Sequence, residues 1–116
     1  MRSLMLTLPL AMLLMAATSP NEAALDDARC LLVLGQLGAS QDETAQRAGQ
    51  LGSQYYFGRL DGREVSDLEA LLNEAAATMK PEDLDSTLQR CGAVLQERGL
   101  ALQAIGERMI SDAGAQ

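Results

Sequence analysis

Cys30 and Cys91 are the residues of this chain whose type and spacing point most directly to a chemical role, and they are its only two cysteines. A redox or metal-binding role needs close spacing such as C-x-x-C, which this pair lacks. A distant pair in a short exported chain instead forms a structural disulfide, and closing a loop of about 60 residues stabilises a fold by roughly 4 kcal/mol. We therefore predict a Cys30–Cys91 disulfide.

The amino terminus supplies the argument for export. Arg2 precedes an apolar run that ends in small residues, which is the layout of a secretory signal peptide. The run is shorter than the roughly 20 residues of a membrane span, and Pro9 interrupts it. We expect a signal peptide over residues 1–23, cleaved between 16 and 23, and a periplasmic or secreted protein that leaves the membrane after cleavage.

Composition excludes several kinds of site. The net charge of −7 disfavours nucleic acid and anionic membrane surfaces as partners, since both attract basic patches. The absence of histidine excludes catalytic triads and the usual zinc sites. The segment 58–63 suggests a calcium loop, but aligning Gly62 with the invariant loop glycine places Phe57 and Arg59 at ligand positions. We expect no metal, no cofactor and no enzymatic activity.

The elements that must position the cysteines are helices. Ala, Leu, Gln and Glu dominate, and runs of alternating β-branched residues are missing. We predict a small single-domain, all-α bundle of four or five helices stapled by one disulfide, with the helical domain over 24–110 and a frayed tail over 111–116. The expected helices are 21–35, 40–60, 66–79, and a final segment that begins near 80–83.

Local signals indicate where these helices begin and end. We expect a capping box from Ser40 to Glu43, a left-handed glycine at Gly62 to end the second helix, and Ser66 as the N-cap of the third. The first helix contains the apolar segment 30–34 and should be central. The disulfide should place it alongside the last helix, with the other two packed around them.

The final segment leaves two questions open. Leu84, Leu88, Cys91, Leu95, Leu102, Ile105 and Met109 keep one helical phase across Gly99, so either one helix or two would satisfy the pattern. Gly92, Gly99 and Gly106 recur every seventh residue and would line one edge. We expect this edge to pack against the first helix; the alternative is a groove for a partner helix.

All three aromatic residues lie in the triplet 55–57. Tyr55 and Tyr56 share a helical face with small residues, among them Gly49 and Gly52, which predicts close helix packing capped by aromatic rings. Phe57 points elsewhere. We expect its ring to be covered by the turn that follows the helix, and the alternative is an exposed anchor for a partner.

Arg59 continues the tyrosine stripe and is expected to pair with Asp61 or Glu64. Aromatic and arginine side chains are the usual anchors of interfaces. The candidate partner-binding residues are Tyr56, Phe57, Arg59, Arg63 and Glu64.

The segments Cys30-Leu31, Tyr55 to Arg63, Arg90-Cys91-Gly92 and Leu102 to Gly106 together resemble an uncharacterised group of short exported two-cysteine helical proteins of Gram-negative bacteria. The resemblance implies export and a disulfide-linked helical fold, and it assigns no site. In outline only, the chain is also similar to periplasmic immunity proteins of type VI secretion effectors and to periplasmic acid-stress chaperones.

These observations favour a non-enzymatic periplasmic protein-interaction module, either an inhibitor of the immunity type or an envelope factor. The alternative is an acid-activated periplasmic chaperone, in which protonated carboxylates and self-repulsion loosen the helices. An enzyme is a third, disfavoured hypothesis. The identity of the partner and the oligomeric state stay open.

Overall fold

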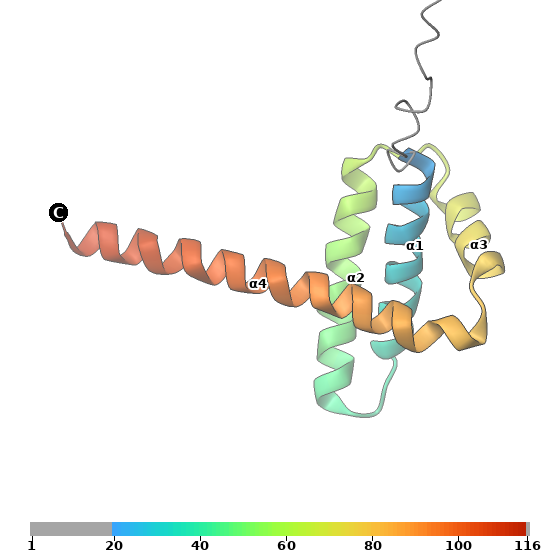
Figure 1. The fold of residues 1–116 in the computed structure, drawn as a ribbon, viewed down its shortest axis with the longest axis horizontal. Helices are drawn as coiled ribbons and strands as arrows, with labels where there is room; N and C mark the ends of the chain where they lie inside the picture. Colours follow the sequence, from blue (N-terminus) through green and yellow to red (C-terminus); the bar gives the residue numbers. More distant parts are fainter. Residues whose placement is uncertain (1–19, 116) are drawn as a thin grey trace, which may run out of the picture.

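The computed structural model describes residues 20–115, which form four α-helices and one short 3-10 turn (Figure 1). The elements are α1 (Pro20–Leu37), α2 (Glu43–Gly62), α3 (Leu68–Thr78), η2 (Pro81–Asp83) and α4 (Leu84–Gly114). No strand occurs in the described part of the chain, so the predicted all-α class is confirmed. The predicted signal peptide lies outside the described residues except for residues 20–23, which begin α1.

Helix α1 is the centre of the body formed with α2, α3 and the first turns of α4, as predicted (Figure 1). It lies between α2 and α3, and α4 crosses it. One buried cluster joins the first turns of α1 to Leu60 of α2 and Ala75 of α3. A second gathers Cys30, Leu34, Tyr56 and Cys91. Because α1 packs against each of the other three helices, it is the element on which the others are assembled.

Two glycines let α2 approach α1 closely. Gly49 and Gly52 are buried, and a Cβ atom added at Gly49 would lie 2.6 Å from the carbonyl oxygen of Leu34. A Cβ at Gly52 would lie 2.8 Å from methyl groups of Leu34 and Leu95. The close packing predicted from small residues on this face of α2 is confirmed, and the aromatic cap follows in Tyr56.

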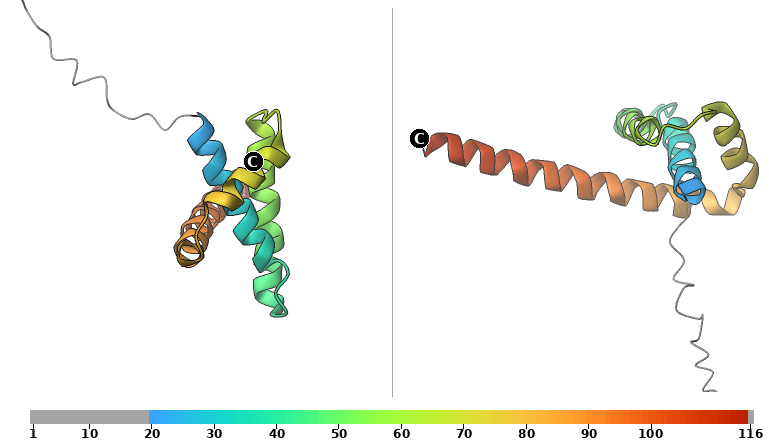
Figure 2. Two further views of the ribbon diagram at one scale, coloured as in Figure 1. Left: turned by 90° about the vertical axis from the view of Figure 1, so that its right-hand side faces the viewer. Right: turned by 90° about the horizontal axis from the view of Figure 1, so that it is seen from above.

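Cys30 of α1 and Cys91 of α4 form the predicted disulfide, with their Cα atoms 5.6 Å apart. Helix α4 is continuous through Gly99 and, past the body, extends as a single helix (Figures 1 and 2). Helix α4 crosses α1 at the disulfide, whereas we expected the two helices to lie side by side. The four residues 111–114, where we expected a frayed end, belong to this helix.

The expected packing of the glycine edge is wrong. A Cβ atom added at Gly92, Gly99 or Gly106 would meet nothing within 4 Å. Gly99 and Gly106 lie beyond the crossing, where α4 has left α1, and Gly92, next to Cys91, is on a side of α4 with nothing packed against it. The glycine edge stays open.

Three expected helix boundaries also differ from the structure. The caps are aspartates, with Asp42 accepting from the amide of Ala45 and Asp67 accepting from the amide of Ala70, instead of Ser40 and Ser66. Gly62 does not adopt a positive φ. The left-handed residue after α2 is Glu64, with φ of 54°. Carboxylates one or two residues further along were better placed for the free amides than the serines that sequence matching selected.

Candidate binding surface

A buried carboxylate clamps the end of α2 to α1. The Asp27 side chain is 7% exposed, and its oxygens accept hydrogen bonds from Arg59 Nε at 3.1 and 3.2 Å and from Arg63 Nε at 2.7 Å. The expected pairing of Arg59 with Asp61 or Glu64 is therefore wrong. The partner lies on a helix 32 residues earlier, which no local pattern in the sequence would reveal.

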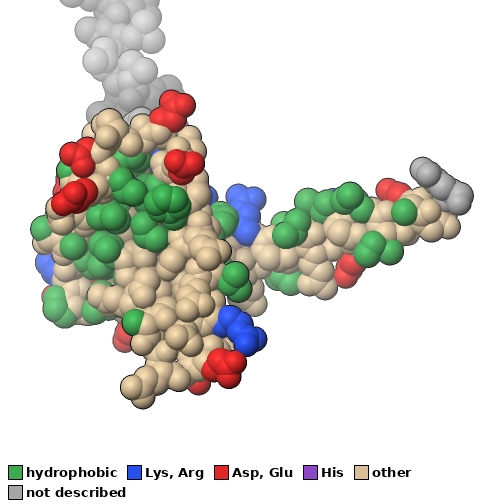
Figure 3. Space-filling model, turned by 180° about the vertical axis from the view of Figure 1, so that it is seen from behind, with side chains coloured by type: hydrophobic (Ala, Val, Ile, Leu, Met, Phe, Trp, Pro, Cys, Tyr) green, Lys and Arg blue, Asp and Glu red, His purple; other side chains and the backbone are tan. Residues whose placement is uncertain are grey.

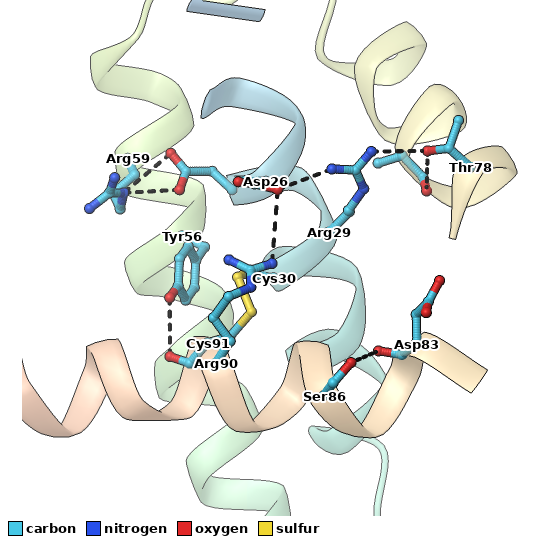
Figure 4. Close-up of polar contacts among 12 residues, drawn as sticks. Asp26, Arg29, Cys30, Tyr56, Arg59, Thr78, Asp83, Ser86, Arg90 and Cys91 are labelled. Carbon is cyan, nitrogen blue, oxygen red and sulfur yellow. Dashed lines mark hydrogen bonds and ion pairs between the residues drawn. A yellow bond between two sulfur atoms is a disulfide. The ribbon is translucent and has the colours of Figure 1, made fainter. Parts of the chain in front are cut away.

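The two tyrosines complete this internal framework. The Tyr56 hydroxyl donates to the carbonyl oxygen of Cys91 at 3.1 Å, next to the disulfide (Figure 4). The Tyr55 and Tyr56 rings meet edge to face with centroids 5.0 Å apart. Burial raises the pKa of the Tyr56 phenol above its usual value. The hydrogen bond to Tyr55, and further the contact with Asp27, raise the pKa of Arg59.

A second acid on α1 faces the other elements. Asp26 lies between Arg29, at 3.0 Å, and Arg90 of α4, at 3.9 Å, while Arg29 also donates to Thr78 of α3 (Figure 4). The adjacent Asp26 and Asp27 thus form ion pairs with different arginines. Sequence reasoning missed both. The signal that was present is an acidic pair in a helix expected to be central, where a charge needs a partner.

Phe57 lies outside this framework. Its side chain is 51% exposed, so the expectation that the following turn would cover it is wrong. The turn leaves a hollow of about 100 Å³ between α2 and the start of α3. Phe57, Leu60, Asp61, Glu64, Val65 and Leu68 line the hollow. We call these residues the Phe57 surface.

Apolar side chains also gather more broadly on the back of the body. Figure 3, seen from the side opposite Figure 1, shows hydrophobic side chains over the body with acidic side chains along the upper edge. The Phe57 surface has the same character on a small scale, because the carboxylates of Asp61 and Glu64 flank apolar side chains. Such a surface would suit an apolar side chain that has lysine or arginine residues beside it.

The structure separates the five candidate residues into two sets. Tyr56 is 2% exposed, and Arg59 and Arg63 are bound to Asp27, so these three hold the body together. Tyr56 cannot present its ring to a partner. Phe57 and Glu64 remain accessible and share the hollow with Val65 and Leu68. The candidate binding surface therefore keeps two of the predicted residues and shifts from α2 toward α3.

The described residues form a small all-α domain held by one disulfide. Within residues 20–115, no helix has the length and hydrophobicity of a membrane span, and no three side chains of the metal-binding types lie together. No protein-family model matches the chain, and neither a curated protein nor a solved structure matches it. The resemblance drawn from the sequence stays a prediction, and function has to be argued from geometry.

Proposed function

We propose that this chain is an exported, non-enzymatic interaction module that binds a protein partner through the Phe57 surface. The observation that carries the proposal is a half-exposed phenylalanine above a hollow with carboxylates at its rim. Aromatic side chains, phenylalanine included, are enriched at protein interfaces, and a few anchor residues carry most of the binding energy there. The proposal includes a signal peptide and a periplasmic or secreted location, which the disulfide supports because such bonds persist in oxidising compartments.

Ion pairs to α1 hold one side of the surface in place before any partner arrives. Arg59, on the same helix as Phe57, and Arg63, the residue that follows this helix, are bound to Asp27 of α1, which fixes the end of α2. Glu64, at the rim, is held with φ of 54°, in the left-handed region that residues other than glycine seldom adopt. Strained residues of this kind gather at ligand-binding positions. A preorganised surface loses less entropy on binding, which favours a specific partner.

The partner's chemistry follows from the rim. Asp61 and Glu64 flank the hollow, and the whole chain carries a charge of −7. We expect the partner to insert an apolar side chain with lysine or arginine beside it. Opposite charges at the rim would speed association and make it sensitive to salt. Both an inhibitor of a basic effector and an envelope factor fit this description.

The geometry favours this function over an acid-activated chaperone. Such a chaperone keeps its apolar surface covered until acid loosens the fold. In this structure Phe57 and Leu51 of α2 are already exposed beside an intact core. A surface that is open in the folded state indicates constitutive binding.

The test starts with a photo-crosslinking residue placed at position 57 of the full chain, and at position 51 as the matched control. Leu51 lies on the same helix and is 65% exposed, so it reports nonspecific apolar contact. We expect the periplasmic fraction to yield a partner that crosslinks at 57 and not at 51. With that partner purified, Phe57→Ala should weaken binding by about tenfold or more, and Leu51→Ala should not.

Charge reversal at the rim supplies the second arm. Glu64→Lys should slow association with the partner and remove part of its salt dependence. Equal crosslinking at 57 and 51, or equal binding by the two alanine variants, would remove the Phe57 surface from consideration. Apolar binding that appears only in acid would support the chaperone instead.

A further inference from the structure

The carboxyl-terminal part of α4 is an ordered helix without neighbours in the described part of the chain. Leu95 is the last α4 residue packed against the second core cluster. From 96 to 114 every residue is exposed except Gly106, which is intermediate. Figure 2 shows this segment running away from the body. We call residues 96–114 the α4 arm.

The apolar face of α4 that packs in the body continues along the arm, where it is exposed to solvent. Leu88, Cys91 and Leu95 pack in the body. At 100° per residue, Leu102, Ile105 and Met109 continue their face along the arm. Leu102 is 70% exposed and Met109 is 67% exposed. Large apolar side chains in a row on one helical face are typical of a helix that pairs with another helix.

The two ends of this face carry opposite charges. Arg98 and Asp112 lie seven residues on either side of Ile105, a spacing that returns to the same face after two turns. In an antiparallel pair of identical arms that cross at Ile105, Arg98 of each copy faces Asp112 of the other. In a parallel pair, like charges would meet at both ends. For a pair of identical arms, these charges therefore favour the antiparallel orientation over the parallel one.

The length of the arm is consistent with antiparallel pairing about Ile105. Ile105 is the midpoint of residues 96–114, so an antiparallel crossing there covers both arms along their whole length. The end of each arm then reaches the place where the other arm leaves its body. Gly99 and Gly106 border the apolar face with open space above them, and their lack of side chains lets two backbones approach closely.

We propose that the protein forms a twofold dimer through antiparallel pairing of two α4 arms about Ile105. The occupant of the exposed apolar face is a second copy of this chain. The Phe57 surface contains no residue of the α4 arm, so the dimer would carry two such surfaces on one particle. The proposal is independent of what the Phe57 surface binds.

Sedimentation equilibrium on the chain with its disulfide intact tests the pairing. We expect a mass of twice the monomer at micromolar concentrations, and Ile105→Asp should weaken the dimer by about tenfold or more. Leu100→Asp is the matched control, because Leu100 lies on the same arm, is 60% exposed and points away from the proposed face. The arm has no neighbours in the body, so both variants should keep the stability of the body. A monomer at these concentrations, or equal effects of the two changes, would overturn the proposal.

Orientation is tested separately. Arg98→Asp should weaken the dimer, and the double change Arg98→Asp with Asp112→Arg should restore it. A mixture of Arg98→Cys and Asp112→Cys chains should form a mixed disulfide, whereas Arg98→Cys alone should not crosslink. Efficient crosslinking of Arg98→Cys with itself would show parallel pairing and refute the antiparallel register.

Discussion

Arg63 donates through Nε to Oδ2 of Asp27 at 2.7 Å, and this contact ties the residue that follows α2 to the first half of α1. Arg59 reaches the same carboxylate one turn earlier. The acid is buried, while the Arg59 and Arg63 side chains are 37% and 32% exposed. Two partly hydrated guanidinium groups thus compensate one buried charge. Removing the acid should therefore lower the stability of the fold more than removing either arginine.

Asp27→Asn should lower the free energy of unfolding by about 1.5–3 kcal/mol, because neutralising the acid weakens the charged hydrogen bonds from Arg59 and Arg63 in a buried place. The matched control is Glu43→Gln, which removes the charge from the exposed i,i+4 pair with Arg47 and should change stability by less than about 0.5 kcal/mol. Urea melts of the two variants measure the difference. Equal midpoints would show that the clamp contributes no more than a surface pair.

Gly49→Ala should destabilise the protein by about 1–3 kcal/mol or more, since the new methyl group would meet the backbone of α1. Gly58→Ala lies on the same helix with nothing within 4 Å of the added atom. It should stabilise α2 by up to about 1 kcal/mol through helix propensity. Thermal melts followed by circular dichroism compare the pair. A neutral Gly49→Ala would mean that the two helices are not in close contact.

Glu64→Gly should raise the stability by about 0.5 kcal/mol, because relief of the left-handed strain slightly exceeds the added chain entropy of glycine. The same change should weaken partner binding, since it removes a rim carboxylate and loosens the turn. Gly62→Ala is the control two residues earlier, with no positive φ and open space around it, and should stabilise without affecting binding. Loss of stability in Glu64→Gly would argue against strain at this residue.

Tyr56→Phe should cost about 1 kcal/mol near neutral pH by removing the hydrogen bond to the Cys91 carbonyl. Burial raises the pKa of Tyr56 in the folded protein. Above about pH 10 the unfolded chain therefore releases this proton first, and stability falls as pH rises toward the folded pKa. The variant should lose less stability than the native chain between about pH 9 and about pH 11. Parallel alkaline slopes in denaturant melts would contradict the assignment.

Patterns within one helix predicted much of the fold. The helical phase of the apolar residues located the helices, and the long spacing of Cys30 and Cys91 in an exported chain predicted their disulfide. The small residues before Tyr56 predicted that this face of α2 packs closely against another helix, which the structure shows to be α1. Each of these inferences depends only on residues that are near one another in sequence, or on a pair with a single bonding choice.

Contacts between helices were harder to predict. The partner of Arg59 is Asp27, and the residues around Arg59 in the sequence give no reason to prefer Asp27 over acids closer in sequence, such as Asp61. Phe57 was expected to be covered because a turn follows it, but the extent of coverage depends on where α3 begins. The open glycine edge of α4 depends on a crossing angle, which periodicity does not encode.

The disulfide also acts as a fulcrum. Helix α4 has no break between Cys91 and Gly114, a stretch of roughly 35 Å at the rise of an α-helix. By simple leverage, a tilt of about 10° at Cys91 would displace the far end by roughly 6 Å. Small adjustments around Cys30, Tyr56 and Arg90 are therefore magnified at the tip. The distance between two bodies joined through their arms would be set by the packing of a few side chains around one sulfur–sulfur bond.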